Sequence, residues 1–260
     1  MYHYSWLELI PGAESGLESA LGLTSGQALA IMGSWTICLI LTVVALLARS
    51  GLNAAIAKGG TAQFVPDSRL SLRNSFELLV EGLDDLFQSI LGKKDARAFF
   101  WLLGGVFTYI LASNLMGTFP GLLPPTDNIN TNMAMALVVL VTFNAVGISR
   151  QGLGPYFKHL LGPVWWLSPL LFLVEFLGLF VVRPISLSLR LTGNIFGDHL
   201  VFGIMSQLTH GIVIPFIFLG LGIFVSFIQA LVFTLLSSVY IAVAATVEDH
   251  GDHHESPGHS

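Results

Sequence analysis

A short polar stretch inside a long apolar region carries the residues best suited to chemistry. Residues 183–199 read RPISLSLRLTGNIFGDH. Residues 200–241 contain no acid and no Lys or Arg, and residues 167–182 contain one acid, Glu175. An arginine at bilayer depth costs roughly 2.5–3.5 kcal/mol on insertion scales. Arg190 must therefore face the interior of a helix bundle, a partner or a water-filled cavity.

The same region supplies groups that can gain and lose protons. Glu175, Asp198 and His199 can titrate, and an intramembrane chain of Asp, Glu and His is the usual material of a proton relay. The alternative is an ion pair with Arg183 or Arg190 that compensates the charge inside the chain. A guanidinium stays protonated at any useful pH, so Arg190 cannot carry a proton, but it can hold or repel a partner's carboxylate.

Helical spacing gathers the polar residues of this stretch on one face. At about 100° per residue, that face holds Ser186, Arg190, Gly193, Asn194 and Gly197. Small residues on a helix face allow another helix to approach closely. In the following apolar block, Gln229 lies on a face with Gly222, Ser226 and Phe233. Gln229 is therefore either a hydrogen-bonding neighbour of the first helix or an amide satisfied within ordinary packing.

The composition identifies the class of protein that must position these residues. The 260 residues are 53% hydrophobic and 10% charged, whereas soluble domains carry about 25% charged residues. No basic patch indicates nucleic-acid binding, and the single cysteine, Cys38, excludes a disulfide framework and a thiolate metal cluster. The tail histidines fit no defined metal site; they are His250, His253, His254 and His259. We expect an all-α polytopic membrane protein without a metal or cofactor.

Apolar runs predict about five membrane helices. They cover residues 28–48, 98–119, 133–148, 166–207 and 212–246. Residues 72–90 instead alternate apolar and acidic side chains at helical spacing. This pattern predicts an amphipathic helix that lies on the membrane surface or packs against a partner.

The fourth apolar run is too long for one upright span. Residues 166–207 would form a helix roughly 63 Å long, against a hydrocarbon core of about 30 Å. No polar turn divides the run, although Pro169 and Pro184 are candidate kinks. We therefore expect a strongly tilted helix that forms a slanted hairpin with residues 212–246.

Basic residues predict the orientation of the chain. All eleven Lys and Arg lie within residues 49–97, within residues 150–158, or at Arg183 and Arg190. The positive-inside rule makes those two segments cytoplasmic, with the N-terminus outside and the C-terminus in the cytoplasm. We expect a single membrane domain, residues 1–260. Its parts are an outer N-terminal segment (1–26), upright spans with the surface helix (27–164), the tilted hairpin (165–247) and a cytoplasmic tail (248–260).

Three runs resemble one known family. RPISLSLRLTGNIFGDH resembles the signature of subunit a of F-type ATP synthases, in which Leu-x-Gly separates an Arg from an Asn. NLMGTFPGLLPPTDNINTNMAMAL resembles that family's connection between its second and third spans, and FIQALVFTLLSSVYIAVA resembles its last helix. The similarity runs in order over roughly residues 70–248.

The resemblance implies an upright bundle with a long tilted hairpin packed against a rotating ring of c subunits. Arg190 matches the arginine that faces the ring carboxylate. Asn194, His199 and Gln229 match positions of the half-channel that opens away from the cytoplasm. We expect Asp198 on the same outer path, and Glu175 with Arg183 on the inner path.

The resemblance also implies partners and a location. The partners are the c-subunit ring, b-type peripheral stalk subunits and the lipid bilayer. We expect a multi-pass protein of the bacterial inner membrane, rather than of an organelle, that is a non-catalytic subunit of the ATP-synthesising complex.

The sequence departs from the family pattern at several positions of the hairpin. Position 199 is Glu in some members and His here, and Gly222 stands where some members carry His or Glu. Our hypothesis is that Asp198 supplies the missing polar group across the hairpin. Glu175 lies about one residue off the family's usual spacing to the Arg183-Pro184 pair.

Two other functions remain open at the level of sequence. A secondary transporter would use Arg190 to bind an anionic substrate, and it predicts internal repeats and paired broken helices, neither of which is visible. A non-conducting membrane anchor would use the polar face only for packing. The expected mechanism is instead proton transfer through two offset half-channels, which Arg190 separates.

Overall fold

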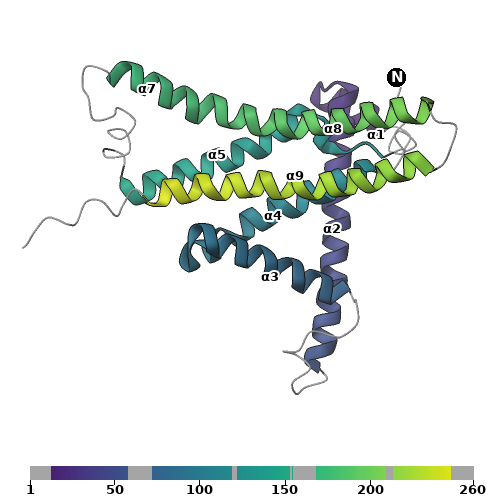
Figure 1. The fold of residues 1–260 in the computed structure, drawn as a ribbon, viewed down its shortest axis with the longest axis horizontal. Helices are drawn as coiled ribbons and strands as arrows, with labels where there is room; N and C mark the ends of the chain where they lie inside the picture. The colour runs from purple at the N-terminus through teal and green to yellow at the C-terminus, as the bar shows by residue number, and fades with distance from the viewer. Residues whose placement is uncertain are drawn as a thin grey trace, which may run out of the picture.

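The computed structural model describes residues 13–57, 72–118, 122–152, 154, 168–208 and 213–246. Every element in this part of the chain is helical (Figure 1). In chain order the elements are α1 (Ala13–Leu21), α2 (Ser25–Ala57), α3 (Leu72–Leu91), α4 (Lys93–Thr118), the 3₁₀ turn η3 (Pro125–Asp127), α5 (Ile129–Gln151), α7 (Ser168–Leu177), the π-helical turn η4 (Gly178–Val182), α8 (Arg183–Leu208) and α9 (Val213–Thr246). The predicted all-α membrane fold is confirmed.

Within the described ranges, four helices are long and apolar enough to cross a membrane. These candidate spans are Ser25–Ser50, Lys93–Thr118, Ile129–Arg150 and Leu219–Ala245. They correspond to four of the five runs that the sequence indicates. The remaining run forms α7, η4 and α8, and α8 is less apolar because it contains Arg183, Arg190 and Asp198.

The first arm of the hairpin is built from three helical elements without a break between them. α7, η4 and α8 follow one another directly and form one long rod beside α9, and both run crosswise to α2 in Figure 1. Inside the rod, the backbone N–H of Arg183 donates to the carbonyl of Gly178, five residues back, which defines the π turn. Pro184 follows immediately and has no N–H to donate, so the helical hydrogen-bond pattern must adjust near this point.

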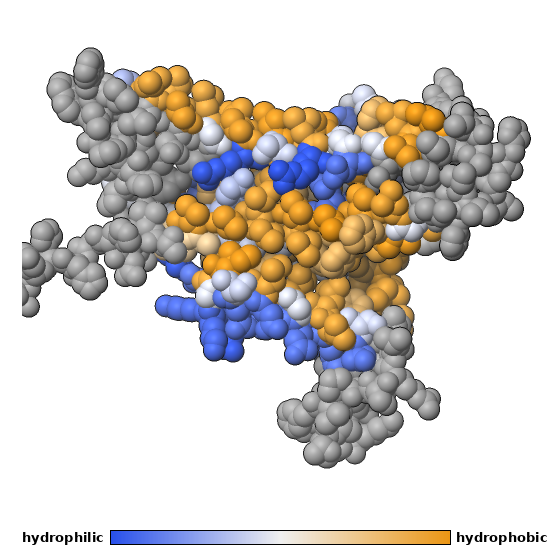
Figure 2. Space-filling view, in the orientation of Figure 1, coloured by the Kyte–Doolittle hydropathy of each residue, from blue (hydrophilic) through white to orange (hydrophobic). Residues whose placement is uncertain are grey.

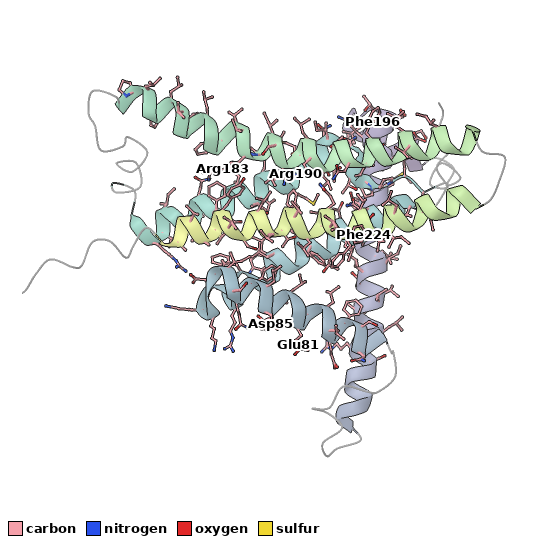
Figure 3. All side chains as sticks on the ribbon, in the orientation of Figure 1. Glu81, Asp85, Arg183, Arg190, Phe196 and Phe224 are labelled. Carbon is pink, nitrogen blue, oxygen red and sulfur yellow. The ribbon has the colours of Figure 1, made fainter. Side chains whose placement is uncertain are left out.

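The amphipathic segment forms α3 and packs against the bundle. Its apolar side contributes Leu83 and Phe87 to the core, and the ring of Phe87 meets that of Phe100 on α4 edge-on at 5.8 Å. Glu81 and Asp85 lie on the opposite, hydrophilic edge (Figures 2 and 3). Gly92 separates α3 from α4 with φ of 78°, a conformation that glycine adopts readily.

One apolar core joins the hairpin to the upright helices. α4 packs against α9, and α5 packs against both α8 and α9. Its most buried side chains include Leu103, Phe107, Val139, Leu191, Phe233 and Ile241. At one end of this core, Arg150 of α5 forms a two-point ion pair with Asp95 of α4. One of its hydrogen bonds, from Nη1 to Oδ2, is 2.9 Å long.

Candidate functional site

The polar face of α8 points away from the core. Ser186, Arg190, Gly193 and Asn194 are exposed. Leu187, Leu191 and Ile195, on the other side of the helix, are buried in the core. The helical-face interpretation of the sequence is therefore confirmed. Figure 2 shows a hydrophilic strip between the apolar surfaces of α8 and α9, and Figure 3 places Arg183 and Arg190 in that strip.

Arg190 has no partner among the side chains that the structure describes. It is exposed, and neither a hydrogen bond nor an ion pair joins it to any of them. A guanidinium carries five N–H donors, so an unpaired one at membrane depth needs an acceptor from water or another molecule.

One turn beyond Arg190, the two helices of the hairpin are joined by amide side chains. Asn194 Nδ2 donates to Gln229 Oε1 at 2.5 Å. The hydrogen bond that the sequence suggested between Gln229 and the first helix is therefore present. Gln229 is only 4% exposed, and its Nε2 has no partner in the described part of the structure. A buried donor of this kind is costly unless water or another acceptor meets it.

Arg183 lies against two aromatic rings. Its guanidinium carbon is 5.7 Å from the ring centroid of Phe143 on α5 and 4.8 Å from that of Tyr240 on α9. Both distances fall in the range of cation–π interactions. Sequence reasoning assigned no role to Phe143 or Tyr240, since an aromatic residue in an apolar helix looks like ordinary core.

The three titratable candidates lie on the first helical rod. Glu175 is in α7, and Asp198 and His199 are in α8. Their side chains lie outside the described part of the structure, so their place in a proton relay stays a prediction. The tail histidines also lie outside the described residues.

A second polar cluster, which sequence reasoning missed, lies behind the hairpin. Asn132 of α5 is fully buried, and its Nδ2 donates to the carbonyl of Thr126 at 2.6 Å and to Oγ1 of Thr192 on α8 at 2.8 Å. Thr126 in turn donates from Oγ1 to Oδ1 of Asn114 at 2.9 Å. The cluster ties α4, η3, α5 and α8 together. Its signal in the sequence was Asn114 within the second apolar run and Asn132 directly before the third.

Gly222 faces α4. A Cβ atom built on Gly222 would lie 3.7 Å from Cγ2 of Thr118, an ordinary van der Waals distance. Gly222, which departs from the family pattern, therefore lies opposite a small polar side chain within the described structure.

Together these features define a polytopic helical membrane protein whose hairpin carries an exposed arginine with no partner among the described side chains. The family model described as "ATP synthase A chain" matches residues 31–242. Since the match covers most of the sequence, the chain belongs to this family.

Bacterial relatives agree with that assignment. ATP synthase subunit a of Trichlorobacter lovleyi is 38% identical over 225 residues, which are 86% of this chain and 90% of the relative. The subunit a of Bdellovibrio bacteriovorus is 38% identical over 248 residues, 95% of this chain and 99% of the relative. That of Syntrophobacter fumaroxidans is 41% identical over 203 residues, 78% and 82% of the two chains.

Family membership makes the chain a component of a membrane ATP synthase. The candidate spans and the bacterial relatives indicate a protein of a bacterial inner membrane. The transporter and anchor alternatives are not favoured. In addition, the described part of the hairpin contains a hydrogen-bonded π turn rather than the unwound segment of a broken transporter helix.

Proposed function

We propose that this chain is the stationary proton-conducting subunit of the synthase, and that it does not itself catalyse ATP formation. A ring of c subunits turns against the hydrophilic strip between α8 and α9, and b-type stalk subunits hold the chain in place. Arg190 carries this proposal. It is exposed and has no partner among the described side chains, and such a cation fits a carboxylate that arrives and leaves on a moving partner.

Protons reach the ring from the outer side in this mechanism. They pass His199, Asp198, Asn194 and Gln229 and protonate a ring carboxylate. The orphaned Nε2 of Gln229 supports a hydrated path here, because water would satisfy that buried donor. Asn194 and Gln229 hold each other across the hairpin, so the two helices offer a fixed polar surface to the proton.

After the ring turns, the carboxylate loses its proton on the inner side, near Glu175 and Arg183. Arg190 attracts the deprotonated carboxylate and prevents a direct proton leak between the two paths. The two paths must be separated, because protons would otherwise cross the membrane without turning the ring. Moving one charge across the membrane potential releases about 2.3 kcal/mol per 100 mV.

Removal of the unpaired cation tests this function. In membrane vesicles containing the whole synthase, Arg190→Ala should abolish proton-driven ATP synthesis while the complex still assembles. Leu189→Ala, at a neighbouring exposed position off the polar face, is the matched control and should retain synthesis. Proton-driven synthesis by an assembled Arg190→Ala complex would contradict the proposal. Proton leak through the ring complex with and without this chain separates a channel from an anchor.

We also propose that Asp198 supplies the polar group that Gly222 lacks. α8 and α9 are adjacent in the hairpin, so a carboxyl group on one helix can serve a path that both line. Asp198→Gly should lower proton-driven synthesis about tenfold or more, and a further Gly222→His change should restore part of it. Equal activity of the Asp198→Gly and unmodified complexes would refute this role.

A further inference from the structure

The hairpin carries a second arginine on the same side as Arg190, in a different environment. Arg183 and Arg190 are seven residues apart on α8, two helical turns or about 10.5 Å. Seven residues bring a helix back to nearly the same face. Arg190 is exposed, whereas Arg183 is partly buried between α8, α5 and α9. Both lie in the strip between α8 and α9 in Figure 3.

On the sides of α5 and α9, Arg183 is surrounded by aromatic rings. The rings of Phe143 and Tyr240 lie 6.1 Å apart with an interplanar angle of 49°, and both contact the guanidinium. Phe143 is only 3% exposed, so the core holds its ring firmly. No carboxylate among the described side chains pairs with Arg183.

The backbone also fixes the direction in which Arg183 leaves its helix. Its N–H closes the π turn by donating to Gly178 O, and the ring of the following residue, Pro184, fixes the φ angle at that position. One turn further on, Ser188 is fully buried and donates from Oγ to the carbonyl of Pro184 at 2.8 Å. The side chain of Arg183 therefore starts from a well-anchored segment.

A cation–π contact differs chemically from an ion pair. The ring quadrupole attracts the guanidinium without cancelling its charge. We propose that the Phe143–Tyr240 pair keeps Arg183 as a fixed positive charge beside the inner path and prevents it from binding the ring carboxylate. Phe143 and Tyr240 are thus positioning residues that leave Arg190 as the arginine available to the ring.

This inference rests on the proposed function, because it concerns a carboxylate that passes both arginines. If Arg183 were released, its flexible side chain would compete with Arg190 for the same deprotonated carboxylate. The ring would then be held at a second place two turns away, and rotation would slow. Substitution of the rings should therefore reduce turnover only while Arg183 is present.

A double-mutant cycle in the assembled synthase tests this dependence. Phe143→Leu with Tyr240→Leu should lower proton-driven ATP synthesis on the order of fivefold. In an Arg183→Gln background, the same two changes should alter the rate by less than about twofold. Tyr240→Phe keeps the ring and should keep the rate. Phe107→Leu removes a comparably buried aromatic ring, 2% exposed, from the core and should act equally in both backgrounds.

A second measurement reports on Arg183 directly. Modification of Arg183 by phenylglyoxal, followed by mass spectrometry, should be several-fold faster in the Phe143→Leu/Tyr240→Leu complex than in the unmodified and Phe107→Leu complexes. Equal losses of synthesis in both Arg183 backgrounds, or an unchanged modification rate, would overturn the inference. Those results would leave the proposed function intact, whereas coupled synthesis by Arg190→Ala would refute the function itself.

Discussion

Among the described side chains of α8, several polar groups have a partner within the chain, and Arg190 has none. Thr192 accepts from Asn132, Asn194 donates to Gln229, and Arg183 lies on two aromatic rings. Arg190 has no such contact among the described side chains. A polar group without a partner is costly inside a lipid bilayer, so we infer that water or another molecule meets Arg190.

The Asn194–Gln229 hydrogen bond should couple these two residues energetically. Gln229→Leu leaves Asn194 without its acceptor, and Asn194→Ala leaves a buried amide oxygen unpaired, which costs about 1–3 kcal/mol. Each single change should slow proton conduction through the membrane sector about tenfold. The double variant should be little slower than either single variant, as measured by passive proton flux in vesicles. Strictly additive losses would show that the two amides act independently.

The sequence showed which polar residues lie inside apolar segments, but it did not show which side chains of different helices contact one another. An Arg inside an apolar block singles out Arg190, helical spacing places Asn194 on the same face, and Gln229 was one of two open alternatives as a neighbour of that helix. The rings around Arg183 could not be identified in this way. Phe143 lies 40 positions before Arg183 and Tyr240 lies 57 after it, and only the packing of three helices brings them together.

At the scale of elements, Pro124 packs closely against the C-terminal end of α4. A Cβ atom on Gly117 would lie 2.7 Å from Cγ of Pro124, whose ring cannot move aside easily. Gly117→Ala should therefore cost about 1–3 kcal/mol through overpacking. Thermal inactivation of the detergent-solubilised complex should occur at a lower temperature.

Gly105 provides the matched comparison on the same helix. Nothing lies within 4 Å of a Cβ built there, so Gly105→Ala adds a methyl group to open space. Alanine also favours helix more than glycine does, by about 1 kcal/mol. The inactivation temperature of this variant should stay the same or rise. If the inactivation temperature fell equally in both alanine variants, the Pro124 contact would not explain the loss of stability.

The sequence predicted which segments form helices, but it did not predict where the helices end or where a turn is irregular. The amphipathic pattern over residues 72–90 corresponds closely to α3, Leu72–Leu91. The first apolar run predicted a helix over 28–48, whereas α2 extends over Ser25–Ala57 because polar residues can continue a helix beyond its apolar part. The π turn at Gly178–Val182 was not predicted, since residues 176–182 are apolar on every side and show no periodicity that could distinguish a π turn from an α turn.

For the whole molecule, the two ends of the bundle differ in charge. Arg97 and Arg150 occur with Lys93 and Lys94 at one end of α4 and α5, while the other end carries η3 and uncharged Asn residues. We infer from this asymmetry that the end with the lysines is cytoplasmic and that η3 faces outward.

Cysteine labelling in sealed vesicles can test this orientation. In a Cys38→Ala background, Lys94→Cys should react with an impermeant maleimide only from the cytoplasmic side, and Asn130→Cys only from the outer side. Both positions are exposed, so differences in burial do not confound the comparison. Labelling of both cysteines from the same side would exclude the proposed topology.

The π turn has a consequence for register along the long first rod of the hairpin. In an uninterrupted α-helix, the eight-residue step from Glu175 to Arg183 would overshoot two full turns by about 80°. A π turn takes up one residue more than an α turn, so the eight-residue step behaves like a seven-residue step. Backbone position 175 thereby comes into line with positions 183 and 190. The irregular turn therefore keeps backbone position 175 in phase with the two arginines of α8 along the rod.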